Sequence, residues 1–93
     1  MRIIQSRSFE KKLKKFSKKQ KLIIDENIKL INNNPTIGTE KKGDLQEVFV
    51  HKFKINKTQY LLSYRFSKSI LELIIIGPHQ NYYRDLKKYF KNK

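Results

Sequence analysis

The sequence contains no cysteine, and its 8 acidic residues are far outnumbered by 22 lysines and arginines. Without cysteine the chain has no disulfide, no thiol nucleophile and no thiolate metal site, which fits a reducing cytoplasm. The N-terminal residues lack the long apolar stretch of a signal peptide. The longest apolar run, residues 73–76, is too short to span a bilayer. We therefore expect a soluble cytoplasmic protein.

Several sequence motifs of catalysis and cofactor binding are also absent. There is no P-loop, no GxGxxG segment and no serine-centred nucleophile elbow. The two histidines, His51 and His79, lie far apart in the sequence, and the acidic residues are scattered, so no cluster of metal ligands is visible. We expect neither a metal nor an organic cofactor.

Length and charge define the class of protein. Residues 1–93 suffice for a single domain with one modest core. The formal net charge of +14 causes self-repulsion, which a polyanionic partner would relieve. Phosphate backbones attract such proteins whatever the base sequence, so RNA, DNA and an acidic protein all fit this charge.

The first residues predict a short strand and a basic helix. Residues 2–5 place two isoleucines between polar neighbours, as a short strand does. Phe9, Leu13 and Phe16 then recur at helical spacing in a segment whose other residues are mostly lysine. This spacing predicts a helix over residues 9–17.

A second helix is predicted from a capping signal. Ser17 and Gln20 have the spacing of a capping box, which indicates that a new helix begins there. This helix presents Ile24, Ile28 and Ile31 on one face. It ends at three consecutive asparagines followed by proline, which disfavour further helix.

The remaining chain has the period of strands and then of a helix. After a loop over residues 36–44, three strands are predicted over residues 48–55, 60–66 and 70–76, and a helix over residues 82–90. The order β-α-α-β-β-β-α predicts an α+β domain with a mostly antiparallel sheet. The two N-terminal helices pack on one sheet face, and we expect the other face to stay open.

The first strand of this meander carries two lysines on one side. Alternation puts Lys52 and Lys54, the lysine pair, on one face and Phe49, His51 and Phe53 on the other. On an open face the lysine pair would attract phosphate. The alternative is that both are ordinary solvated charges in a lysine-rich chain. We expect His51 to be structural or peripheral, since it faces away from the lysine pair.

Two further residues are candidates for the same face. Arg65 shares a face with Leu61 and Ser63, and its guanidinium joins the lysine pair if that face is the same one. At a sheet edge it would instead be solvated charge. His79 follows Gly77 and Pro78, where the last strand ends, and we expect it to be aimed into the cleft of the open face.

The chemistry that fits these residues is RNA cleavage by attack of a 2′-hydroxyl. That reaction needs a group that takes one proton, a group that gives another, and cations that stabilise the phosphate. Histidine exchanges protons near neutral pH, and lysines supply the cations without a metal. The alternative for His79 is a surface or helix-capping role.

Two tyrosines follow at the start of the last helix. Tyr82 and Tyr83 point about 100° apart on a helix, so only one of them can face the cleft. Tyr83 lies four residues after His79 and shares its helix face, so we predict that Tyr83 stacks on a base and Tyr82 packs with Leu86. The other residues that we predict to bind nucleic acid are basic: Arg65, Arg84, Lys11, Lys12, Lys15 and Lys19.

The order of elements and three segments resemble the RelE/ParE family of bacterial toxins, the basic partners in type II toxin-antitoxin pairs. The segments are residues 43–45, 50–64 and 77–86, and the most specific is GPHQNYYRDL, a glycine-x-histidine ahead of an aromatic pair and Arg-Asp-Leu. The resemblance covers nearly the whole chain and implies the compact α+β fold inferred above. It also implies a cognate antitoxin, whose acidic helical segment would cover the cleft or displace the last helix.

The resemblance implies different activities for different branches. RelE-like members cleave mRNA in the ribosomal A site without metal, using a Lys-x-Lys pair that Lys52 and Lys54 match. They place an arginine where this chain has Leu61, a departure. His79 and Tyr83 match instead the spacing of a histidine and an aromatic residue in the YafQ-like branch. We therefore expect an mRNA endoribonuclease in which His79, Lys52, Lys54 and Tyr83 are catalytic.

Two alternatives stay open. ParE-like members share the fold but inhibit DNA gyrase and do not cleave RNA, and nothing in the composition excludes this. The second alternative is a nucleic-acid-binding module without catalysis. In that case the lysine-rich helix binds phosphate, and the binding affinity falls steeply as the salt concentration rises.

Overall fold

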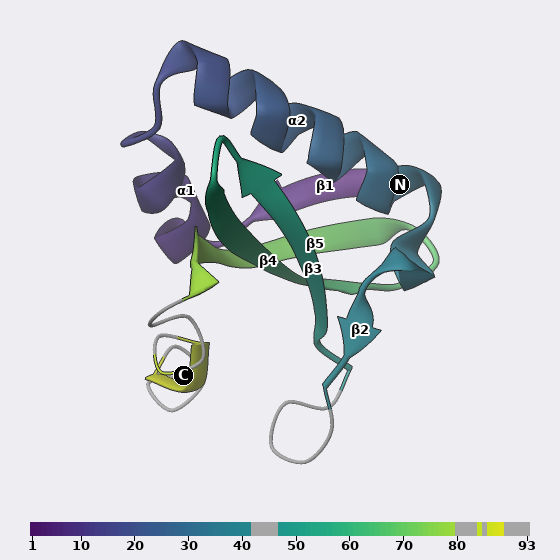
Figure 1. Ribbon diagram of the computed structural model, residues 1–93. Helices are drawn as coiled ribbons and strands as arrows, with labels where there is room; N and C mark the ends of the chain where they lie inside the picture. Colours follow the sequence, from purple (N-terminus) through teal and green to yellow (C-terminus); the bar gives the residue numbers. More distant parts are fainter. Residues whose placement is uncertain (42–46, 80–83, 85, 89–93) are drawn as a thin grey trace.

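The computed structural model describes residues 1–41, 47–79, 84 and 86–88. The elements in chain order are β1 (Arg2–Gln5), α1 (Arg7–Leu13), α2 (Lys18–Asn33), η1 (Pro35–Ile37), β2 (Thr39–Glu40), β3 (Phe49–Ile55), β4 (Thr58–Phe66) and β5 (Ile70–Pro78). The strands form one sheet in the order β1-β5-β4-β3-β2, antiparallel except for the β1–β5 pair. α2 runs across one face of this sheet (Figure 1). The α+β fold predicted from the sequence is confirmed.

The C-terminal part of the chain is described only in places. Of the helix predicted over residues 82–90, Arg84 and residues 86–88 are helical, and the others lie outside the described residues. In the part of the chain that the structure describes, no helix is long and apolar enough to cross a membrane.

Serine caps divide the N-terminal helices. The side chain of Ser6 accepts a hydrogen bond from the Phe9 amide at 2.9 Å, so α1 begins before the predicted residue 9. Ser17 and Gln20 form the predicted capping box of α2. The prediction that the first helix reaches residue 17 is wrong. As the N-cap of α2, Ser17 has an extended backbone (φ −69°, ψ 168°), so the first helix cannot include it. The first helix, α1, ends at Leu13.

The main core lies between the helices and the sheet. Phe9 of α1 and Ile24 and Ile31 of α2 are fully buried there. They pack against residues of three strands: Phe53, Ile55, Leu62, Tyr64, Leu71, Leu73 and Ile76. Burial of each large apolar side chain contributes about 1.5–3 kcal/mol, so this layer holds both helices to the sheet.

Tyr64 fixes the segment that follows α2. Its hydroxyl donates to the Pro35 carbonyl at 2.7 Å and accepts from the Gly38 amide at 3.0 Å. Burial raises the pKa of Tyr64, although the Gly38 bond opposes this shift, so the hydroxyl remains a donor. A β-carbon on Gly38 would stand 2.7 Å from that hydroxyl oxygen, so only glycine fits. The sequence predicted a loop over residues 36–44. Residues 36–40 of that segment instead contain most of η1 and all of β2.

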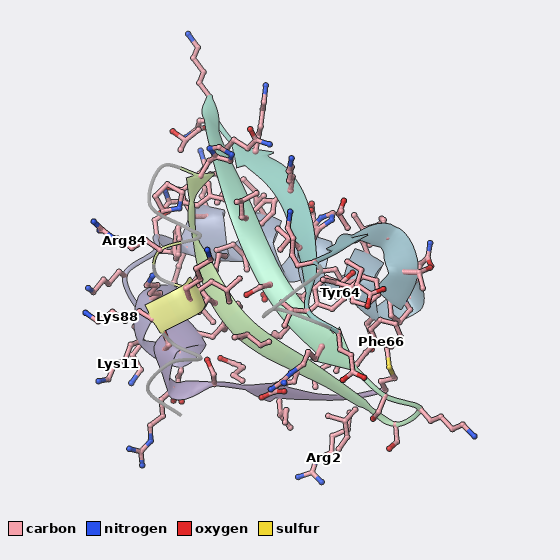
Figure 2. The ribbon with its side chains drawn as sticks, turned by 90° about the horizontal axis from the view of Figure 1, so that it is seen from below. Arg2, Lys11, Tyr64, Phe66, Arg84 and Lys88 are labelled. Atoms are coloured by element: carbon pink, nitrogen blue, oxygen red, sulfur yellow. The ribbon has the colours of Figure 1, made fainter. Side chains whose placement is uncertain are left out.

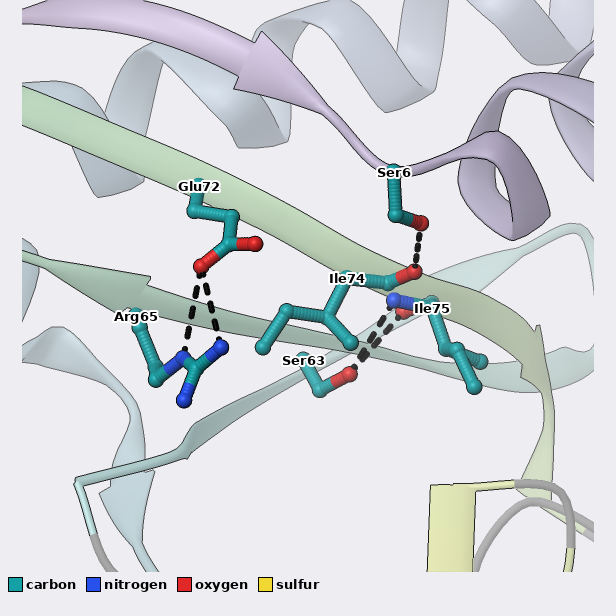
Figure 3. A network of polar contacts seen from close by, with 6 residues as sticks. All are labelled: Ser6, Ser63, Arg65, Glu72, Ile74 and Ile75. Atoms are coloured by element: carbon teal, nitrogen blue, oxygen red, sulfur yellow. Dashed lines mark hydrogen bonds and ion pairs between the residues drawn. The ribbon is translucent and has the colours of Figure 1, made fainter. Parts of the chain in front are cut away.

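A β-bulge interrupts the pairing of β4 and β5. Ser63 pairs with Ile75, whereas the next residue, Tyr64, pairs with Leu73, so β5 has one extra residue at Ile74. The fully buried Ser63 hydroxyl accepts a hydrogen bond from the Ile75 amide at 3.2 Å (Figure 3). Ile74 and Ile75 both join a second apolar cluster, while Leu73 belongs to the main core.

This second cluster occupies the sheet face away from α2. Its members are Val48, Val50, Leu61, Ile74, Ile75 and Leu86. Leu86 belongs to the C-terminal helical residues and is fully buried. The expectation that this face stays open is therefore wrong at its centre, because a buried apolar side chain from the end of the chain packs there.

We predict that Tyr64→Phe lowers the free energy of unfolding by about 1–3 kcal/mol, because it leaves the Pro35 carbonyl and the Gly38 amide without their partner. Urea unfolding measures the change. Tyr60→Phe is the matched control, since it removes the same hydroxyl from a half-buried ring of the same strand. Equal effects of the two substitutions would contradict this role of Tyr64.

Candidate functional site

The lysine pair projects from β3 on the face away from α2. Lys52 and Lys54 are exposed, whereas Phe53 and Ile55 between and after them are buried in the main core. His51 lies on the helix-facing side, where its ring stacks on Phe53 with centroids 5.9 Å apart. The alternation expected along this strand is therefore present, with the lysines on one face and the aromatic residues on the other.

The register of the sheet brings the end of β5 towards the lysine pair. Lys52 pairs with Leu61 of β4, which pairs with Gly77 of β5. Because neighbouring strands lie about 4.8 Å apart, Gly77 lies roughly 10 Å from Lys52. β5 continues through Pro78, beyond the predicted end at residue 76, and the exposed His79 follows directly. His79 and the lysine pair thus occupy the same end of the sheet.

The residues predicted beyond His79 are described in part. Tyr83 lies outside the described residues. Arg84 is exposed and helical. Arg84 and Lys88 project at the same end of the molecule as Lys11 of α1, at the left of Figure 2. The C-terminal residues therefore add positive charge to the side of the molecule on which α1 lies.

Arg65 lies apart from the lysine pair. Alternation along β4 places it on the same face as Leu61, but four residues farther along the strand, which is about 13 Å. Its guanidinium pairs with Glu72 of β5, with Nη2 3.2 Å and Nε 3.3 Å from one carboxylate oxygen (Figure 3). Arg65 shares the predicted face, yet it does not join Lys52 and Lys54.

The predicted lysines of the helices surround the start of α2 and the end of α1. Lys11, Lys15 and Lys19 are exposed, and Lys12 is half-buried. Lys12 and Lys15 line a hollow of about 260 Å³ between the end of α1 and the end of β5. Sequence analysis did not predict this hollow, because helical spacing indicated only that Phe16, one of its lining residues, packs towards the core.

His51 connects α2 to β3. Its Nε2 donates to the Asn27 side-chain oxygen at 2.9 Å, and the Asn27 amide nitrogen donates to the Ile23 carbonyl at 2.8 Å. Burial lowers the pKa of His51 from its ordinary value of 6.5, which favours the neutral ring. These contacts support the structural role expected for His51.

Comparison with known proteins supplies a family and a fold. A family model described as the ParE-like toxin of type II bacterial toxin-antitoxin systems matches residues 3–87. A chain of the intact E. coli RelBE toxin-antitoxin complex is similar in structure, with a TM-score of 0.65 and 15% identity over 82% of this chain and 93% of that chain.

The isolated E. coli RelE toxin is similar as well, with a TM-score of 0.65 and 16% identity over 94% of this chain and 96% of that chain. At such low identity these two structures show a shared fold and nothing finer. No curated protein sequence matches the chain.

We predict that His51 makes the folded state less stable in acid. Because its pKa is lowered in the folded state, the unfolded chain binds more protons below about pH 6.5, and the free energy of unfolding falls there. Urea unfolding between pH 8 and 5 measures this fall, which His51→Gln should reduce. Asn27→Asp should reverse the contribution, because a carboxylate beside Nε2 favours the charged ring. A slope unchanged in both variants would contradict the assignment.

Proposed function

Because the chain belongs to the ParE-like toxins of type II bacterial toxin-antitoxin systems, we propose that it acts as a metal-independent endoribonuclease that cleaves mRNA on the ribosome. The observation that supports this activity is the location of three residues at the same end of the sheet. Lys52 and Lys54 are exposed on one face there, and His79 is exposed at the end of β5.

These side chains suit a cleavage reaction in which the nucleophile is the 2′-hydroxyl of the RNA. The 2′-oxygen attacks the adjacent phosphorus, a 2′,3′-cyclic phosphate forms, and the bond to the 5′-oxygen breaks. A base takes the 2′ proton and an acid gives a proton to the departing 5′-oxygen. His79 is the proton carrier in this proposal, and Lys52 and Lys54 stabilise the charge on the phosphate. Tyr83, four residues after His79 in the sequence, would stack on a base.

The partners follow from charge. Lys11, Lys15, Lys19 and Arg84 are exposed and would contact phosphates of mRNA or ribosomal RNA. A net charge of +14 also favours an antitoxin with an acidic helical segment. The E. coli chain that shares this fold was solved in a toxin-antitoxin complex, which supports an antitoxin as the cognate partner.

Inhibition of DNA gyrase is the second candidate function. The observation in its favour is that the matching family model is the ParE-like one. The resemblance described above implies gyrase inhibition for the ParE-like branch. A gyrase inhibitor does not need lysines and a histidine gathered to hold phosphate. For this reason the lysine pair and His79 favour the ribonuclease.

We predict that induced expression of the wild type arrests bacterial growth and produces new mRNA 5′ ends inside codons, detected by primer extension on an abundant message. His79→Ala, or Lys52→Ala with Lys54→Ala, should abolish both effects, because each removes a group that the reaction requires. Lys68→Ala is the matched control: it is exposed in the turn before β5, at the opposite end of the sheet, and should stay toxic.

Growth arrest without new RNA ends would overturn the ribonuclease proposal. Loss of supercoiling by purified gyrase on addition of the protein would then establish the second candidate. Full toxicity of His79→Ala, with unchanged RNA ends, would remove His79 from the chemistry.

A further inference from the structure

The hollow between α1 and the end of β5 combines aromatic rings with positive charge. Phe16, Tyr60, Ile76 and Pro78 line it, together with Lys12 and Lys15. Phe16 and Tyr60 are both half-buried, and their rings meet edge to face with centroids 5.6 Å apart. Apolar and aromatic surface beside lysines is the combination that single-stranded nucleic acid requires, because bases stack on rings while phosphates meet cations.

The hollow is continuous with the candidate catalytic end of the sheet. Gly77 and Pro78 line it, and His79 is the next residue. Gly77 is also the last member of the row that begins at Lys52 and passes through Leu61. A β-carbon on Gly77 would stand 3.8 Å from Nζ of Lys12, which places that ammonium directly beside the end of β5. The hollow lies on the helix face of the sheet, because Phe16, Tyr60 and Ile76 pack towards the main core, whereas the lysine pair lies on the other face. A strand held by the lysine pair therefore reaches the hollow around the end of the sheet, past His79.

The size of the hollow selects the occupant. A volume of about 260 Å³ accommodates a single base but not a helix of a protein partner. An acidic peptide would use the charge of Lys12 and Lys15 but would leave the exposed parts of the Phe16 and Tyr60 rings without a flat apolar partner. A nucleotide satisfies both features at once.

We propose that this hollow binds one nucleotide of the single-stranded RNA substrate, next to the phosphate that is cleaved. The base packs on Tyr60 and Phe16, and a backbone phosphate contacts Lys12 and Lys15. This inference rests on the proposed ribonuclease function and adds to it a specific subsite. The subsite holds the strand in place while His79 and the lysine pair act on the neighbouring phosphate.

Photocrosslinking of a short single-stranded RNA tests the subsite without requiring cleavage. Every ribose carries a 2′-O-methyl group, so the attacking oxygen is blocked, and one base is 5-iodouracil, which crosslinks to aromatic side chains. Trypsin then separates the peptide with Phe16 (residues 16–18) from the one with Tyr60 (residues 58–65). Tyr64, also in the second peptide, is fully buried, so a crosslink there reports on Tyr60.

We expect crosslinks on these two peptides, and about a tenfold loss of RNA affinity in Phe16→Leu and Tyr60→Leu, because a ring that stacks on a base is removed. The double substitution of Lys12→Gln and Lys15→Gln should reduce the logarithm of the RNA affinity. This reduction should be more than twice that caused by the single substitution Lys14→Gln. Lys14 is the matched control, since it is exposed on the same segment and does not line the hollow. The lysine variants keep the test valid if loss of a ring disturbs folding.

Crosslinks confined to other peptides would overturn the proposal. So would an equal loss of RNA affinity for each charge removed in the Lys12 and Lys15 double variant and in Lys14→Gln. Displacement of the RNA by polyglutamate as readily as by unlabelled RNA would also overturn it, because the surface would then recognise charge alone. Because the blocked RNA is not cut, these results are independent of whether the wild type produces new mRNA ends in cells.

Discussion

The antiparallel register of β3, β4 and β5 is the constraint on which both the core and the candidate site depend. Alternation along β3 sends Phe53 into the main core and Lys52 to the opposite face. The same pairing sets Leu61 between Lys52 and Gly77. A shift of one residue would exchange the two faces, bury the lysine pair beneath α2 and separate it from His79. Core burial therefore enforces the geometry of the site.

The bulge in β5 is the second element of this arrangement. The extra residue at Ile74 lets Leu73 and Ile76 both face the main core, although regular alternation would place them on opposite faces. Ser63 supplies the hydrogen bond that stabilises the irregular segment. Beyond the bulge the strand is again in register, and this correction brings the chain to His79 at the end of the sheet that carries the lysine pair.

What the sequence could predict followed from local periodicity. The two faces of β3 and the capping box at Ser17 depend on residues within a few positions of one another, and both were predicted. The pairing of Arg65 with Glu72 depends on the strand register and the bulge, for which the sequence carries no local signal. The burial of Leu86 against the second face likewise depends on how the end of the chain packs. The location of His79 just after the last strand was predictable, but its location at the same end of the sheet as the lysine pair required the sheet register.

The most direct test of the central claim is the chemistry of the RNA ends made in cells that express the wild type. Attack by the 2′-oxygen leaves a 5′-hydroxyl on the downstream fragment. Adaptors that join only to 5′-phosphates should therefore capture the new ends after treatment with a polynucleotide kinase, and not before it. Ends captured without kinase treatment carry 5′-phosphates, which would mean that water was the nucleophile. That result would contradict the role assigned to His79 and the lysine pair.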